Sequence, residues 1–543
     1  MRYFVFTRSC ISILIFLVCL AAGDSLGAAK KLTVVAKWGR FEQSFKSTLP
    51  YSNPIQEATL SVVLVSPLGE TNQVYGFWDG GKTWRVRFSP NQPGRWTFRT
   101  MCSDAANSGL HDQAGEFVCS AIAGQGRFQQ HGPVRVARDH RHLEHADGTP
   151  FFWLADTVWN GARVSTMKDW ETYAQIRGSQ DFSAAQWSVA PGMEAERQTA
   201  YTGSDRIAIN PDFFQRLDAK LEVLSRAGIL SAIVPLMEIE SPNWSATPLP
   251  EAQALLLVRY VVARWGAEPV AWLLAFDSDN QKQTVQRWKR IGREVFAAGT
   301  HAPVILFPGE TPWLLDEFRD QAWVDVFGSQ TVTDLTDDAL KYTFAGPFPK
   351  EWTKAPPRPL IAFLPTENGV APQSKRRFSA DDVRKAAYWS LLLSPRVGVS
   401  YSGFGVTAWD GAQGAGNLPL WHLALFMPAG KQMTKLARFM GTNDFWRLEP
   451  APKDVATQPG DSSPRRYIAA ASSETRSWSV VYMPEDRTLE VFLDALPPSP
   501  GVTWFNPRTG EHSPAVAVVG GKTCQFPTPD PGDWLLVMKA AVK

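Results

Sequence analysis

Eight apolar segments alternate with helical patterns between residues 151 and about 430, and this alternation constrains the fold more than any other feature. The segments are FFWLAD, FSAAQW, ILSAIVPLME, VAWLLAFD, PVILFPGE, WVDVFGSQ, PLIAFLPTE and GVSYSGFGVTAW. Nearly continuous apolar runs are typical of parallel strands that helices cover on both faces. We therefore predict an α/β fold with a (β/α)₈ barrel. A doubly wound open sheet is the competing fold, but it would more often carry a glycine-rich phosphate loop after its first strand, and LADTVWNG has none.

The segments on both sides of this region have the pattern of β-domains. Short alternating runs separated by turn residues fill residues 30–125, and a similar pattern fills residues 444–543. Such spacing favours β-sandwiches. We expect a signal peptide at 1–29, an N-terminal sandwich at 30–125, a barrel with its connector at 126–443, and a C-terminal sandwich at 444–543.

The first 29 residues have the features of a secretory signal. Arg2 and Arg8 precede an apolar run over residues 11–22, and small residues follow it. The run is too short for a good membrane span, and Val18 before Cys19 does not fit a lipoprotein signal. We therefore expect a secreted or periplasmic protein with no membrane contact after the signal is removed.

Three cysteines remain in the mature chain. Cys102 and Cys119 flank a turn-rich stretch between two predicted strands, so they could form a disulfide across a hairpin, or they could stay as two half-buried thiols. Cys524 would be left over.

Charge and composition narrow the class of ligand. The net charge of +2 gives no electrostatic basis for binding nucleic acid. His140, His142 and His145 lie close in the sequence, but alternation along a strand would separate His145 from the other two, so we predict no metal and no cofactor. The 22 tryptophans suit either apolar cores or flat platforms for sugar rings. The sequence carries no signal for the oligomeric state.

Polar residues follow the predicted strands at the points where a barrel has its mouth. The carboxylates there are Asp156, Glu238, Asp277, Glu310 and Glu367, the amides are Gln186 and Gln330, and the nearby tryptophans include Trp159, Trp187 and Trp409. Carboxylates surrounded by tryptophan suit a sugar-cleaving site, because glycoside hydrolysis needs two carboxyl groups across the scissile bond. We predict Asp277 and Glu367, after the fourth and seventh strands, as the catalytic pair, and the other residues as substrate contacts.

The barrel region resembles the apiosidase-like glycoside hydrolase family. The resemblance rests on HLEHADGTPFFWLADTVWN, INPDFFQRLD, RYVVARWGAEPVAWLLAFD, WVDVFGSQ and AAYWSLLLSPRVGVSYSGFGVTAW, and covers about 130–440. The segment before it is similar to a β-sandwich domain of unknown function, and VVYMP with TWFNPRTGE resembles a small sandwich named for collagen binding.

The resemblance implies an enzyme that releases sugars from the side chains of plant-type polysaccharides, with an Asp after the fourth strand and a Glu after the seventh. Asp277 matches the first of these, whereas Leu364 stands at the aligned position of the second, three residues before Glu367. The alternative to a hydrolase is therefore an inactive carbohydrate-binding or surface-attachment protein that retains the barrel.

Overall fold

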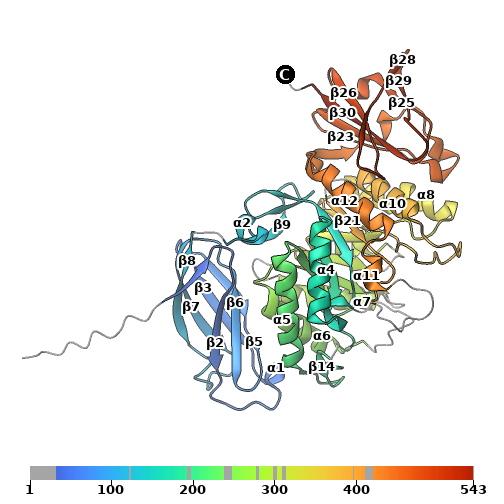
Figure 1. The fold of residues 1–543 in the computed structure, drawn as a ribbon. Helices are drawn as coiled ribbons and strands as arrows, with labels where there is room; N and C mark the ends of the chain where they lie inside the picture. The colour runs from blue at the N-terminus through green and yellow to red at the C-terminus, as the bar shows by residue number, and fades with distance from the viewer. Residues whose placement is uncertain are drawn as a thin grey trace, which may run out of the picture.

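The centre of the molecule is a closed barrel of eight parallel strands (Figure 1). The structure is a computed structural model, and it describes residues 32–541 except 122–123, 193–196, 238–247, 277–280, 298–301, 309–312, 395–396 and 410–419. The barrel strands are β12 (Trp153–Thr157), β13 (Ala184–Ser188), β16 (Leu230–Val234), β17 (Val270–Phe276), β18 (Val304–Pro308), β19 (Val326–Gln330), β20 (Leu360–Phe363) and β21 (Gly398–Tyr401). β12 pairs with both β13 and β21, which closes the barrel and confirms the predicted fold.

Helices surround the barrel wall. They are α3 (Gly161–Val164), α4 (Met167–Ser179), α5 (Pro211–Arg226), α6 (Glu251–Trp265), α7 (Gln281–Phe296), α8 (Asp337–Ala345), α9 (Pro347–Lys350), α10 (Ala380–Leu393), α11 (Trp421–Ala424) and α12 (Pro428–Gly441). Their starts follow local rules: Thr166 caps α4, Ser379 forms a capping box with Asp382 at α10, and Pro211 opens α5. None of the described helices is long and apolar enough to cross a membrane.

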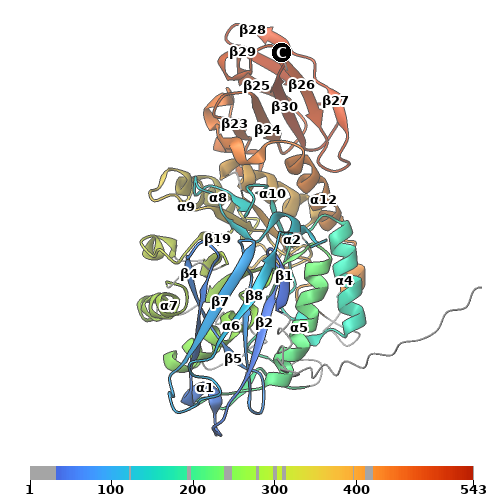
Figure 2. The same ribbon diagram turned by 90° about the vertical axis from the view of Figure 1, so that its left-hand side faces the viewer.

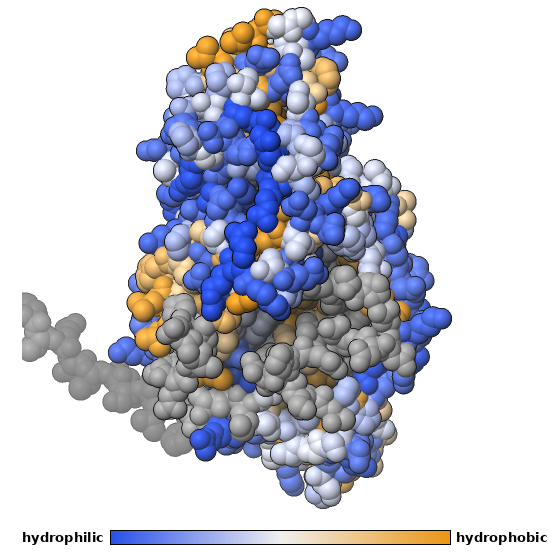
Figure 3. Space-filling view, turned by 90° about the vertical axis from the view of Figure 1, so that its right-hand side faces the viewer, coloured by the Kyte–Doolittle hydropathy of each residue, from blue (hydrophilic) through white to orange (hydrophobic). Residues whose placement is uncertain are grey.

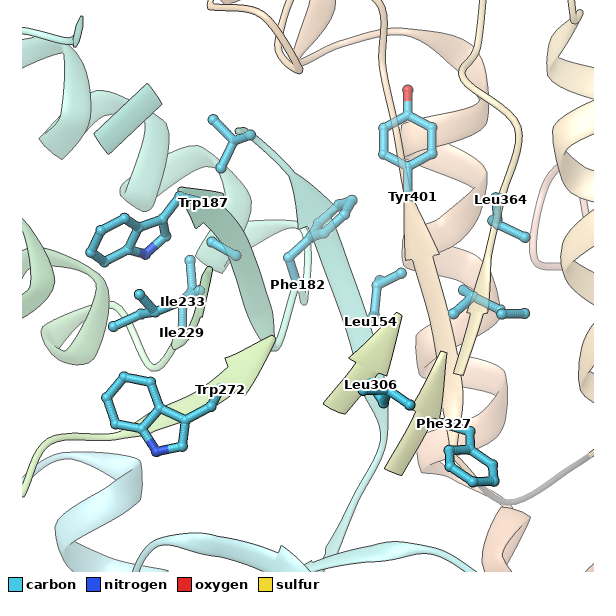
Figure 4. Close-up of a cluster of buried hydrophobic side chains, with 14 of the residues drawn as sticks. Leu154, Phe182, Trp187, Ile229, Ile233, Trp272, Leu306, Phe327, Leu364 and Tyr401 are labelled. Carbon is cyan, nitrogen blue, oxygen red and sulfur yellow. The ribbon is translucent and has the colours of Figure 1, made fainter. Parts of the chain in front are cut away.

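Alternation along the strands divides the buried side chains into two layers. Trp153, Ala155, Leu273 and Phe307 belong to the cluster that fills the lumen. Leu154 and its counterparts on the other strands point outward and join the cluster beneath the helices. Figure 4 shows outward side chains of this second layer, Trp187 and Trp272 among them.

The connector closes the N-terminal end of the barrel. It folds into α2 (Arg127–His131) and the strands β9 (Val134–Val136), β10 (Leu143–His145) and β11 (Pro150–Phe151). Phe128, Val134, Leu143 and Phe151 belong to the same buried cluster as the lumen side chains. The opposite, C-terminal end of the strands is therefore the end available for a site.

The N-terminal domain consists of two sheets beside α5 and α6 (Figures 1 and 2). One contains β1 (Thr33–Ala36), β8 (Ala114–Ser120), β7 (Gly94–Cys102), β3 (Leu60–Val65) and β4 (Thr71–Tyr75), and the other contains β2 (Phe41–Lys46), β6 (Thr83–Phe88) and β5 (Phe77–Trp78). The helix α1 (Pro54–Glu57) lies in a loop of this domain. Buried arginines join it to the barrel: Arg87 and Arg264 each bind Asp218 at 2.8 Å, and Arg264 binds Asp79 at 2.8 Å.

The cysteines of this domain are not paired. Cys102 and Cys119 are both free and buried. Cys119 lies opposite Gly94 at one end of β7, and Cys102 lies at the other end. Eight residues of strand, at about 3.3 Å each, separate the two positions by about 26 Å, whereas a disulfide needs α-carbons within about 7 Å. The predicted hairpin is present. Of the two alternatives for its cysteines, the disulfide is wrong and the free thiols are found, because the two residues occupy opposite ends of the hairpin.

The C-terminal domain packs on α10, and on α12 through the stacked rings of Phe439 and Phe505, above the barrel in Figure 1. Its larger sheet contains β22 (Leu448–Pro450), β23 (Ala469–Ser473), β24 (Trp478–Met483), β30 (Trp534–Ala540), β26 (Pro500–Phe505) and β27 (His512–Pro514), and its smaller sheet contains β25 (Thr488–Phe492), β29 (Thr523–Pro527) and β28 (Val518–Gly520). Asp533 anchors it to the barrel, because Arg384 of α10 donates to this buried carboxylate at 2.7 Å and Tyr482 donates at 2.8 Å.

Candidate active site

The mouth of the barrel has an aromatic floor that the sequence analysis missed. Phe307 of β18 and Phe363 of β20 stack with ring centroids 4.0 Å apart and 7% and 5% of their surfaces exposed. Gly328 of the intervening strand β19 makes room for them, because a Cβ there would lie 2.7 Å from Phe363 Cε2. Residues 305, 307, 361 and 363 share the inward parity of their strands, and that parity is the signal that could have identified the floor.

The other side of the lumen is polar, and its side chains are hydrogen-bonded to one another. Gln186 accepts a hydrogen bond from Thr157 Oγ1 at 2.9 Å and donates one to Ser400 Oγ at 3.0 Å. Trp153 Nε1 donates to the same Ser400 oxygen at 3.1 Å. The predicted contact Gln186 therefore points into the lumen, but below the surface, where it links β12, β13 and β21.

Trp159 and Gln330 occupy the rim of the mouth. Trp159 follows β12 and packs, half-buried, against the lumen cluster, and its carbonyl accepts hydrogen bonds from the Ser188 amide and hydroxyl. Gln330 ends β19 and is half-buried as well. Among the described residues, these two predicted substrate contacts are placed where a ligand in the mouth would meet them.

Asp156 lies on the outer face of the barrel wall. Its carboxylate accepts hydrogen bonds from Arg177 at 2.7 Å and Tyr173 at 3.0 Å, both on α4, and the ion pair with Arg177 has no exposed surface. Burial, and next the Asp156 charge, raise the pKa of the Tyr173 hydroxyl well above 10. The arrangement fixes α4 to β12, and it turns Asp156 away from the lumen.

Glu367 also has its hydrogen-bond partners outside the lumen. Only 3% of the residue is exposed. Tyr401 Oη donates to one carboxylate oxygen at 2.6 Å, and the backbone amide of Ala429, at the start of α12, donates to the other at 3.0 Å. Burial, and next the Glu367 charge, raise the pKa of Tyr401 well above 10, so this tyrosine remains a donor.

The ring of Tyr401 shows which side of the wall this carboxylate occupies. Tyr401 packs edge-on against Phe182, with centroids 6.1 Å apart, and belongs to the layer beneath the helices. Leu364, at the end of the neighbouring strand β20, is buried in the same layer (Figure 4). After the seventh strand, β20, the chain therefore carries a buried leucine, Leu364, and a glutamate, Glu367, whose carboxylate is already hydrogen-bonded.

The remaining predicted residues divide into two groups. Trp187 is buried beneath the helices against Trp265, with centroids 5.6 Å apart, and Trp409 stacks on Trp421 at 4.3 Å with 7% of its surface exposed. Glu238, Asp277 and Glu310 lie outside the described residues.

The connector histidines do not form a ligand set, since no group of three metal-binding side chains occurs in the described part of the chain. His145 is buried against Phe151, with its Nδ1 2.8 Å from the Gly132 carbonyl oxygen.

Comparison with known families matches all three regions. Residues 137–447, more than half of the chain, match the apiosidase-like catalytic domain family. Residues 34–103 match a domain of unknown function, and residues 451–539 match a domain provisionally described as the collagen-binding domain of a collagenase. No curated protein sequence gives a significant match.

Solved glycoside hydrolases share the fold. A protein from Bacteroides vulgatus, provisionally classed as a glycoside hydrolase, is 19% identical with a TM-score of 0.70, and the alignment covers 94% of this chain and 100% of that chain. A family 5 glycoside hydrolase from the same species is 18% identical with a TM-score of 0.64, over 76% of this chain and 95% of that chain. At such low sequence identities the likeness shows only a common fold. The match of residues 137–447 to the family model is what assigns the chain to a family. The chain belongs to the apiosidase-like family of glycoside hydrolases.

Proposed function

We propose that the protein is an exported enzyme that hydrolyses a glycosidic bond in the side chains of plant-type or other complex polysaccharides, with Asp277 as one of its two catalytic carboxyl groups. In the sequence, Asp277 directly follows Phe276, the residue at which β17 reaches the C-terminal end of the barrel. Active sites of such barrels are built at that end. The membership of the family supports the same assignment.

The contacts of Glu367 decide which residue we propose as the second catalytic carboxyl group. Both of its oxygens already accept a hydrogen bond, from Tyr401 and from the first turn of α12, on the helix side of the wall. A catalytic carboxylate must instead reach the sugar in the mouth. We therefore assign the second role to Glu238 or Glu310, which follow β16 and β18, the two strands that pair with β17.

The chemistry of the reaction gives the two carboxyl groups different roles. One carboxyl group stays protonated and donates its proton to the leaving oxygen, while the other, ionised, attacks the anomeric carbon or activates water. Ala275, two residues before Asp277, pairs in register with Phe307 of the aromatic floor. An apolar neighbour disfavours the charged form of a carboxyl group and raises its pKa. The proton donor is therefore expected on the side of the mouth next to this floor.

Hydrolysis of aryl glycosides and plant oligosaccharides by a set of variants tests the assignment. We expect Asp277→Asn to lower kcat by at least about 100-fold, the usual effect of removing a general acid or base. Either Glu238→Gln or Glu310→Gln should cause a similar loss. Glu367→Gln and the exposed control Glu317→Gln should keep kcat within a few-fold of the wild type. Wild-type activity in Asp277→Asn would refute the proposal.

A binding protein without activity is the second candidate, and Leu364 favours it. This residue stands where the resemblance places a catalytic glutamate, and only 4% of its surface is exposed. If the wild type binds oligosaccharides but releases no product from any of them, the second candidate replaces the first.

A further inference from the structure

A small pocket lies at the junction of the barrel and the C-terminal domain. Its volume is about 180 Å³, and it is bounded by α8, α10 and the 3₁₀ turn Pro464–Arg466. Charged and polar groups form its walls, namely Arg376, Ser379, Asp381, Asp382, Lys385 and Arg465, over an apolar base that includes Leu335 and Leu340. Figure 3 shows one face of the molecule, whose upper part is largely hydrophilic, with hydrophobic surface at the very top.

The walls are held in place by contacts between the two domains. Arg465 donates to the carbonyl of Leu335, in the loop after β19. Trp389 of α10 donates to the carbonyl of Tyr467 at 2.8 Å, and the Tyr467 ring stacks on Phe344 of α8 at 4.2 Å. A pocket whose walls are already ordered loses little conformational entropy when a ligand binds.

The pocket presents charges of both signs. Lys385 binds Asp381 at 2.8 Å, and Asp382 accepts from the Ser379 hydroxyl at 2.7 Å. Arg376 is exposed, and its guanidinium has no hydrogen-bond or ion-pair partner among the residues that the structure describes. The carboxylates disfavour an anion and the cations disfavour a cation, whereas a neutral hydroxyl both donates and accepts, so it can bind to either kind of group.

Two of the residues that line the pocket belong to loops that begin at the mouth of the barrel. Val332, in its lining, lies two residues beyond the end of β19, and Arg376 belongs to the loop after β20. Both loops leave the C-terminal end of the barrel, where the mouth lies. Val332 has φ = 54°, which is uncommon for a β-branched residue and marks a constrained turn beside the pocket.

We propose that this pocket is a second carbohydrate site, which binds one neutral sugar unit of the polymeric substrate outside the mouth, with Arg376 as its free hydrogen-bond donor. This inference rests on the proposed function in one respect only, because it takes a polysaccharide as the substrate. Its role would be to hold the polymer while a side chain occupies the mouth.

Arg376→Ala tests the proposal, with Arg226→Ala as the matched control. Arg226 is an exposed arginine at the end of α5, on the opposite end of the barrel. Binding to neutral plant polysaccharides is measured by affinity electrophoresis, and kcat is measured on small aryl glycosides. We expect Arg376→Ala to weaken polymer binding about ten-fold and to leave kcat unchanged, and we expect Arg226→Ala to match the wild type in both.

Three results would overturn the inference: unchanged polymer binding by Arg376→Ala, an equal loss in Arg226→Ala, or binding of uronate-rich polymers only. Should no glycoside be hydrolysed by the wild type while polymer binding still depends on Arg376, the proposed function fails and the second site stands.

Discussion

Removing the Glu367 carboxylate should cost stability rather than catalysis. In the Glu367→Ala variant, the hydroxyl of Tyr401 and the amide of Ala429 each lose a buried acceptor. An unsatisfied buried donor costs about 1–3 kcal/mol. Loss of a negative charge at a helix N-terminus adds about 0.3–1 kcal/mol. We expect the free energy of unfolding to fall by about 4 kcal/mol.

Glu367→Gln separates the charge from the hydrogen bonds. The glutamine oxygen can accept from the Ala429 amide while its amide group donates to the Tyr401 oxygen, so both contacts survive in neutral form. Charge-assisted hydrogen bonds are about twice as strong as neutral ones. We therefore expect this variant to lose only about 1 kcal/mol, and to keep nearly all of its activity.

The assay is urea unfolding followed by tryptophan fluorescence, together with kcat on the best aryl glycoside. Glu317→Gln is the control, because 60% of its side chain is exposed. The reasoning is refuted if Glu367→Ala is as stable as the control. A variant Glu367→Gln with wild-type stability and a 100-fold lower kcat would refute it as well, because Glu367 would then act in the chemistry.

Three further predictions concern the barrel and the connector that closes its N-terminal end. Asp156→Ala should destabilise the protein by about 3–5 kcal/mol in urea unfolding, because it leaves the charge of Arg177 buried and unpaired; a loss below about 1 kcal/mol would contradict the buried pair. Gly328→Ala should cost about 1–3 kcal/mol and raise KM, because its Cβ would displace Phe363 from the floor of the mouth; unchanged stability and KM would argue against that floor. Burial lowers the pKa of His145 to about 4, so the unfolded chain, with a pKa near 6.5, binds more protons between these values. Stability should therefore fall by about 3 kcal/mol as the pH drops from about 6.5 to 4, and His145→Gln should show a flatter pH profile of unfolding than the wild type.

The barrel itself could be predicted because its signals are local. Continuous apolar strands such as VAWLLAFD, helix caps such as Ser379, and the proline that opens α5 are read within a few residues. Together they specified eight strands and the long helices α4, α5, α6, α7 and α10 between them, although not α8 and α9, and the closed sheet followed from their alternation. The hairpin around the cysteines was equally local, whereas their pairing depended on which ends of the strands they occupied.

The side of the wall on which each polar residue lies was decided only by the tertiary structure. A strand places successive side chains on opposite faces, but its sequence does not say which face will be the lumen. The sequence therefore predicted Asp156 at the mouth of the barrel, whereas its ion pair with Arg177 of α4 shows that it lies under the helices. Glu367 found its partners in Tyr401 and in α12, 34 and 62 residues further along the chain. Contacts over such distances depend on the closure of the barrel, which brings β20, β21 and α12 together, and no local pattern encodes them.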